Sequence, residues 1–124
     1  MLFGAVLVFT LGLLGCRTAP VYNVEQSPID VSAKASLEDV KKSIMQSGVG
    51  LGWQMKETEP GLITGTLYLR DHMAQVDIPY SKTNYSINYK DSAALKYDGS
   101  SIHKQYNTWV QNLDRAIQAS LSIL

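Results

Sequence analysis

The sequence predicts an α+β fold in which two helices pack on one face of a four-stranded antiparallel meander sheet. Two stretches with apolar residues at helical spacing enclose four consecutive segments in which apolar and polar residues alternate. Such alternation is typical of strands with one buried face, and short turns between strands favour antiparallel pairing. A short apolar stretch from Val21 to Val24 leaves open an extra N-terminal edge strand.

The first helix is expected from about Leu37 to Ser47. Ser36 followed by Asp39 matches a capping box, in which the hydroxyl and the carboxylate satisfy free amide groups of the first turn. Gly48 suits a left-handed C-cap. The apolar stripe of this helix comprises Leu37, Val40 and Ile44.

The four strands follow directly. The segments 53–59 and 62–70 alternate on either side of Pro60 and Gly61, which predicts a hairpin. Alternation continues after Asp71 and His72, breaks at residues 81–84, and then resumes. The apolar positions of the last two strands are Ala74, Val76, Ile78 and Tyr80, followed by Tyr85, Ile87 and Tyr89.

A long terminal helix is expected behind a Ser100 or Ser101 cap. Its wide apolar stripe must pack on the sheet or on another copy of the chain. The stripe comprises Ile102, Tyr106, Trp109, Val110, Leu113, Ala116, Ile117, Ser120, Leu121 and Leu124.

The N-terminus carries thirteen uncharged residues from Leu2 to Leu14, followed by Gly15 and Cys16. A membrane-spanning helix needs about 20 apolar residues, whereas a signal-peptide core needs only about 7 to 15. The run Leu13-Leu14-Gly15-Cys16 resembles the lipobox of bacterial lipoproteins, although no Lys or Arg precedes the apolar stretch.

The lipobox resemblance implies cleavage between Gly15 and Cys16 and attachment of acyl chains, such as palmitate, to Cys16. Arg17 stands where many inner-membrane lipoproteins carry an aspartate, so we expect an outer-membrane anchor facing the periplasm. Residues 1–15 are then the signal peptide, 16–35 the lipidated cysteine and a tether, and 36–124 one α+β domain. Fully extended, residues 17–35 would reach roughly 60 Å, and docking of the segment from Val21 to Val24 would shorten that reach.

Eleven basic and eleven acidic residues cancel and are interspersed along the chain. That balance argues against nucleic acid or an anionic lipid surface as a partner. Cys16 is the only cysteine, so lipidation leaves no thiol for a disulfide or a metal site. Nothing in the sequence calls for a cofactor.

Most of the chain after Cys16 resembles a family of small uncharacterised proteobacterial lipoproteins. The resemblance implies a lipobox and one small α+β domain, and it carries over no catalytic roles. The residues that carry it are Gly52-Trp53, Pro60-Gly61, Arg70-Asp71-His72, Tyr85 to Tyr89, Asp91-Ser92, Ile102-His103, Tyr106-Asn107 and Trp109-Val110.

Asp71, His72 and His103 are the candidates for catalysis, with Asp91, Ser92, Ser100 and Ser101 as further polar groups. Acyl transfer needs a serine hydroxyl within hydrogen-bond reach of a histidine that a carboxylate orients. Catalytic zinc needs three protein ligands, so two histidines far apart in sequence predict no metal site. The alternative interpretation is structural: His72 closes a strand junction and packs inward, and His103 lies beside a helix cap.

Tyrosine is abundant after Cys16, where phenylalanine is absent. Because tyrosine combines an apolar ring with a polar tip, it suits both a core rim and a recognition surface. Tyr68, Tyr85 and Tyr89 are the candidate binding surface, and the alternative is that they line the core.

We therefore expect a non-enzymatic binding or scaffolding module, held on the membrane through Cys16, with an envelope protein or peptidoglycan as partner and no cofactor. Two alternatives stay open. One is a small periplasmic hydrolase or metal-dependent enzyme that uses Asp71, His72 and His103. The other is a carrier of a small apolar ligand between helices and sheet.

Overall fold

The computed structural model describes residues 17–31 and 35–124. Gly15, Cys16 and the predicted signal peptide lie outside the described residues. The elements in chain order are β1 (Thr18–Pro20), β2 (Val24–Pro28), α2 (Leu37–Gly50), β3 (Gln54–Glu59), β4 (Leu62–Leu69), β5 (His72–Pro79), β6 (Asn84–Ala93), β7 (Ser101–His103) and α3 (Lys104–Leu121).

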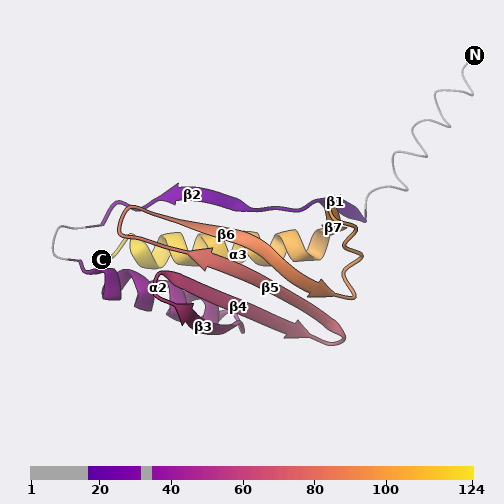
Figure 1. The fold of residues 1–124 in the computed structure, drawn as a ribbon, viewed down its shortest axis with the longest axis horizontal. Helices are drawn as coiled ribbons and strands as arrows, with labels where there is room; N and C mark the ends of the chain where they lie inside the picture. Colours follow the sequence, from indigo (N-terminus) through magenta and orange to yellow (C-terminus); the bar gives the residue numbers. More distant parts are fainter. Residues whose placement is uncertain (1–16, 32–34) are drawn as a thin grey trace, which may run out of the picture.

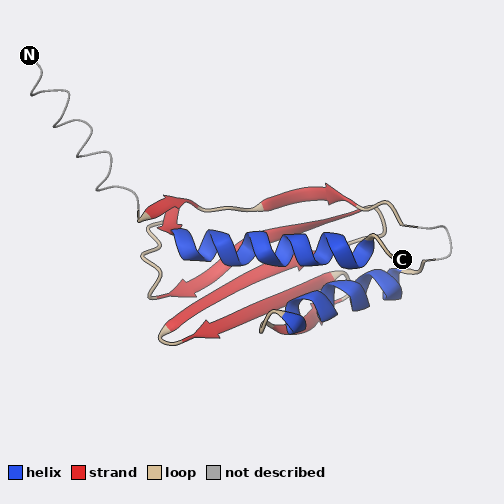
Figure 2. Ribbon diagram, turned by 180° about the vertical axis from the view of Figure 1, so that it is seen from behind, coloured by secondary structure: helices blue, strands red, loops and turns tan. Residues whose placement is uncertain are grey.

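The predicted α+β class is confirmed, and the sheet is larger than the predicted four strands. The meander β3–β4–β5–β6 gains β2 as a fifth antiparallel strand, so the order is β2-β6-β5-β4-β3. An N-terminal edge strand, which the sequence left open, is therefore part of the main sheet, but it spans Val24–Pro28 and shares only Val24 with the expected segment 21–24. Figures 1 and 2 show α2 and α3 together on one face of this sheet, as predicted.

The segment predicted as a tether is mostly folded against the domain. β1 pairs with β7 in a separate two-stranded sheet, with Thr18 opposite His103. The Lys104 amide donates to the Arg17 carbonyl at 3.1 Å, and the Tyr22 amide donates to Asn107 Oδ1 at 2.9 Å. A freely extending tether of roughly 60 Å is therefore wrong for residues 17–31.

Helix α2 begins as predicted and ends three residues later. Ser36 Oγ accepts from the Asp39 amide at 3.1 Å, and Asp39 Oδ2 accepts from the Ser36 amide at 2.8 Å, which completes the capping box. Gly48 is a buried helical residue rather than the C-cap, because β3 packs closely there and a Cβ at this position would collide with Met55. The positive φ occurs instead at Gly52, at +93°.

Helix α3 begins at a different cap from the one predicted. The Asp98 carboxylate accepts from the amides of Ser100 and Ser101 at 3.0 and 2.8 Å, which ties the two serines into the preceding turn. Residues 101–103 then pair with β1. His103 becomes the N-cap, with Nδ1 accepting from the Gln105 amide at 3.1 Å.

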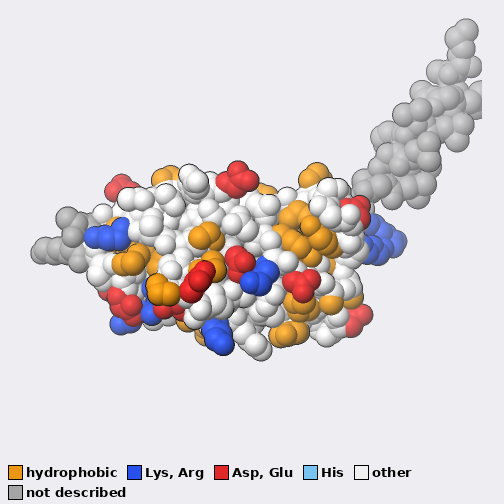
Figure 3. All heavy atoms as spheres, in the orientation of Figure 1, with side chains coloured by type: hydrophobic (Ala, Val, Ile, Leu, Met, Phe, Trp, Pro, Cys, Tyr) orange, Lys and Arg blue, Asp and Glu red, His pale blue; other side chains and the backbone are white. Residues whose placement is uncertain are grey.

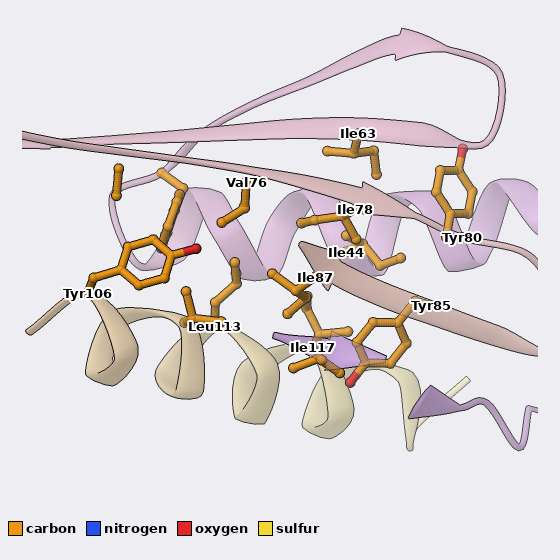
Figure 4. Close-up of a cluster of buried hydrophobic side chains, with 14 of the residues drawn as sticks. Ile44, Ile63, Val76, Ile78, Tyr80, Tyr85, Ile87, Tyr106, Leu113 and Ile117 are labelled. Atoms are coloured by element: carbon orange, nitrogen blue, oxygen red, sulfur yellow. The ribbon is translucent and has the colours of Figure 1, made fainter. Parts of the chain in front are cut away.

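A single core lies between the sheet and the two helices. The apolar positions predicted for β5 and β6 point into it, and Tyr85 and Tyr106 are its largest fully buried side chains. Figure 4 shows Tyr106 at one end of this cluster and Tyr85 at the other, beside Ile117. Each end of the core therefore contains one fully buried tyrosine, Tyr106 or Tyr85.

Candidate functional site

The predicted lipidation and cleavage residues, Cys16 and Gly15, lie outside the described residues. Within the described ranges, neither α2 nor α3 combines the length and the apolar character that a membrane crossing requires.

The two histidines have structural hydrogen bonds. His72 Nδ1 donates to the Ala94 carbonyl at 2.9 Å, and its ring lies 6.4 Å from that of Trp109 between centroids. Its Nε2 is 3.7 Å from Asp71 Oδ1, which is too long for a hydrogen bond. His103 caps α3. His72 thus lies at the strand junction as the structural interpretation expects, although it is only half-buried, and His103 is the helix cap itself rather than a neighbour of the cap.

No hydrolytic triad is assembled among these groups. In residues 17–31 and 35–124, neither imidazole hydrogen-bonds a serine hydroxyl or a carboxylate. The same part of the chain contains no group of three or more His, Cys, Asp or Glu side chains suited to hold a metal ion. In the described residues, Asp71, His72 and His103 are therefore not joined to one another by hydrogen bonds.

The three predicted surface tyrosines do not form one surface. Tyr68 is 63% exposed, Tyr85 is fully buried, and Tyr89 is half-buried. Tyr89 stacks on Tyr97 with centroids 4.1 Å apart and contacts Tyr106 edge-on at 5.7 Å. The prediction that Tyr85 is a surface residue is wrong. Tyr85 lies on the same face of its strand as Ile87, which faces the helices.

Tyr85 lines a hollow at one end of the domain. This hollow, called the distal hollow below, has a volume of about 430 Å³, within the range of ligand sites. It lies where β2 ends beside the last turns of α3. Its lining residues are Ser27, Pro28, Ile29, Asp30, Tyr85, Gln118, Leu121 and Ser122.

A buried carboxylate lies behind the distal hollow. The Tyr85 hydroxyl donates to Asp114 Oδ1 at 2.5 Å, and Gln118 Nε2 donates to Asp114 Oδ2 at 2.9 Å. Asp114 is only 9% exposed, and no Lys, Arg or His of the described chain forms a salt bridge with it. Among the described residues, its carboxyl oxygens therefore have two hydrogen-bond donors and no basic partner.

The environment of Tyr85 favours its protonated form. Burial raises the pKa of Tyr85 to about 12, and the hydrogen bond to Asp114 acts in the same direction. The Tyr85 hydroxyl thus remains a donor to Asp114 at neutral pH. Figure 4 shows this hydroxyl directed toward α3 at the end of the core.

Asp114 was missed as a candidate although the sequence carries a signal for it. Val110, Asp114, Ile117 and Leu121 follow helical spacing, so Asp114 falls within the apolar stripe of α3. A charged residue in such a stripe is buried and needs partners. Tyr85 supplies one partner from β6, which local sequence patterns do not reveal.

The space between helices and sheet offers little room for an apolar ligand. A hollow lined by Leu51, Trp53, Leu67, Trp109 and Asn112 has a volume of about 60 Å³. Ligand pockets start near 300 Å³. This position therefore does not suit the predicted carrier of a small apolar molecule.

No protein-family model, curated protein or solved structure matches the chain. A functional assignment therefore depends on the geometry of the described residues and on the sequence pattern around Cys16.

Proposed function

We propose that the protein is an envelope lipoprotein, anchored through Cys16 in the outer membrane and facing the periplasm, whose domain is a non-enzymatic binding module. The observation that supports binding is Asp114, a buried carboxylate without a basic partner in the described chain, whose two hydrogen-bond donors, Tyr85 and Gln118, line the distal hollow. Uncompensated buried charges are costly, so such a group beside a hollow marks a candidate site.

The lining of the distal hollow favours a ligand that carries an ammonium group on a hydrocarbon stem. Its acidic residue is Asp30, and no Lys or Arg is among its lining residues. Gln118 donates one N–H of its side-chain amide to Asp114, and its carbonyl oxygen can accept a hydrogen bond from a ligand. Pro28, Ile29 and Leu121 supply apolar contact for the stem. Lysine side chains of proteins and diamino acids of peptidoglycan both present this chemistry.

The position of the distal hollow suits a partner away from the membrane. Figure 1 shows the C-terminal end of α3 and the end of β2 at one extremity of the molecule, with β1 and β7 at the other. Arg17, the first described residue, belongs to the β1–β7 end. A second hollow of about 540 Å³ beside Tyr89 and Tyr97 lies near that end, so a periplasmic partner would reach it less easily.

The anchor is tested by Cys16→Ser. We expect the wild-type protein to fractionate with the outer membrane and its N-terminal peptide to carry acyl chains by mass spectrometry. Cys16→Ser should leave the protein unlipidated and its signal sequence uncleaved at residue 15. An unmodified Cys16 in the wild-type protein would contradict the lipoprotein proposal.

Binding is tested with the purified lipidated protein in detergent by NMR. The probes are a lysine-containing peptide, a peptidoglycan peptide that ends in a diamino acid, and the same two molecules with their side-chain amines acetylated. We expect the amine-bearing probes to shift amide signals around Gln118 and Ser122, and the stronger of the two to identify the class of partner.

The matched variants are Asp114→Asn, which removes the charge with little change in shape, and Tyr97→Phe, which alters a hydroxyl far from the distal hollow. Asp114→Asn should abolish the shifts, and Tyr97→Phe should preserve them. Equal binding of the acetylated probes, or full binding by Asp114→Asn, would contradict the proposed site.

A further inference from the structure

The folded domain begins within one residue of the proposed lipid attachment. Arg17 is the only residue between Cys16 and Thr18, the first residue of β1. The Arg17 carbonyl already accepts from the Lys104 amide at 3.1 Å, and Thr18 is paired with His103. An extended chain covers at most about 7 Å over two residues, so β1 cannot lie farther than this from the Cα of Cys16.

The headgroup layer of one bilayer leaflet is about 5–8 Å thick. The acyl chains on Cys16 enter the hydrocarbon region, and the cysteine itself lies near its boundary with the headgroups. If β1 lies within about 7 Å of that boundary, it is at the depth of the headgroups or just above them. The end of the domain that carries β1 must therefore touch the membrane surface.

Three chain segments form this end, which we call the anchored end: residues 17–20, 68–72 and 94–104. The His72 side chain joins the β4–β5 turn to the Ala94 carbonyl at 2.9 Å, and the His103 amide donates to the Leu95 carbonyl at 2.8 Å. Figure 1 shows the β4–β5 turn and the connection from β6 to β7 at the extremity where β1 lies. The three segments therefore present one surface.

Exposed aromatic and aliphatic side chains lie on the segments of the anchored end. Tyr68 is 63% exposed, and Leu69 and Tyr97 are 43% and 41% exposed. Tyrosine is enriched at membrane–water interfaces because its ring enters the apolar boundary while its hydroxyl stays among the headgroups. Exposed side chains of this type are suited to contact with lipid.

The charges of the anchored end are compatible with phospholipid headgroups. Its basic side chains, all exposed, are Arg17, Arg70, Lys96 and Lys104. None of the four forms a salt bridge with a described residue. Of its two carboxylates, Asp98 accepts from the amides of residues 100 and 101, and Asp71 is exposed with its Oδ1 3.7 Å from His72 Nε2, so the four basic side chains outnumber the acidic ones. Figure 3 shows basic side chains at this extremity, beside the start of the described chain.

We infer that the anchored end is a membrane-contact surface that seats the domain directly on phospholipid headgroups, with Tyr68, Leu69 and Tyr97 in the interface. This inference rests on the proposed lipidation of Cys16. The domain then has a fixed orientation on the membrane and does not hang on a long tether. In this orientation the distal hollow points away from the bilayer. Although the whole chain is neutral, the anchor and the exposed rings account for contact without a high net charge.

The test uses the lipidated protein from membranes, reconstituted in vesicles of phosphatidylethanolamine and phosphatidylglycerol. Because Cys16 is the only natural cysteine and is consumed by lipid, an introduced cysteine is the only free thiol. A fluorophore is attached to Tyr68→Cys or Lys96→Cys at the anchored end, and to Ile123→Cys as the control. Ile123 is 84% exposed and follows α3 at the opposite end.

Quenching by lipids that carry a nitroxide on the headgroup is then compared among the three proteins. We expect several-fold stronger quenching at positions 68 and 96 than at position 123. Equal quenching at all three, or stronger quenching at 123, would overturn the orientation. Flotation with the vesicles and the mass of the Cys16 peptide test the anchor separately: loss of both overturns the lipoprotein proposal, whereas flotation with equal quenching overturns the contact surface alone.

Discussion

Replacement of Tyr85 by phenylalanine tests the buried network behind the distal hollow. The change removes one hydroxyl and keeps the ring, so the packing of the core around Ile87 and Ile117 is preserved. Asp114 then loses its 2.5 Å donor and keeps only Gln118. Hydrogen bonds to charged groups contribute about 1.5–3 kcal/mol, so we expect Tyr85→Phe to lower the free energy of unfolding by about 2 kcal/mol.

For a domain of about 100 residues, 1 kcal/mol corresponds to a change in Tm of roughly 4 °C, so Tm should fall by about 8 °C. Urea unfolding at pH 7, followed by circular dichroism, measures the free energy directly. Tyr97→Phe is the matched control, since its exposed hydroxyl contacts only the Gly99 carbonyl at 3.3 Å. In an Asp114→Asn background the penalty of Tyr85→Phe should shrink. A loss below about 0.5 kcal/mol, equal to that of the control, would refute the role assigned to the network.

Three further predictions concern the same domain. Because burial raises the pKa of Tyr85 to about 12 from its ordinary value of 10, the unfolded chain releases this proton first as pH rises. The stability that this group contributes is complete below about pH 10 and is lost toward pH 12, so wild-type stability in urea should fall more steeply over that window than that of Tyr85→Phe. Gly61→Ala should lower the free energy of unfolding by about 1 kcal/mol because Gly61 has φ +82°, while Gly50→Ala, whose added Cβ meets no atom within 4 Å, should not; equal effects in urea would contradict this. Ser36→Ala should cost about 1 kcal/mol through loss of the capping box, and an unchanged Tm would contradict that assignment.

Local patterns predicted the elements that local interactions determine. The capping box at Ser36 and Asp39 involves residues three apart, and the hairpin turn at Pro60 and Gly61 depends on the conformations of those residues. The inward parity of β5 follows from alternation alone. These features were predictable because sequence neighbours carry the information.

The errors occur where distant segments meet. β1 forms only because Thr18 lies opposite His103, 85 positions later, and this pairing also moves the start of α3 beyond Ser101. Gly48 stays helical because Met55 from β3 packs against it. Helix and cap propensities describe only local sequence and give no information on such contacts. Tertiary packing therefore overrides these propensities here.

The candidate site was only partly predictable for the same reason. Tyr85 was singled out, but as a surface residue, although its parity with Ile87 indicates the core. Asp114 interrupts the apolar stripe of α3, which signals a buried charge that needs a partner. That Tyr85 is the partner is known only once β6 and α3 are placed together.

Photo-crosslinking in living cells tests whether the distal hollow binds an envelope partner and whether that binding depends on Asp114. A photoreactive residue replaces Ser122 in the lining of the hollow, with Cys16 retained, and a second protein carries it at Glu59 as the control. We predict one dominant protein or peptidoglycan adduct from position 122, which disappears in the Asp114→Asn background and is absent from position 59. No adduct from position 122, or one that persists in Asp114→Asn, would contradict the claim.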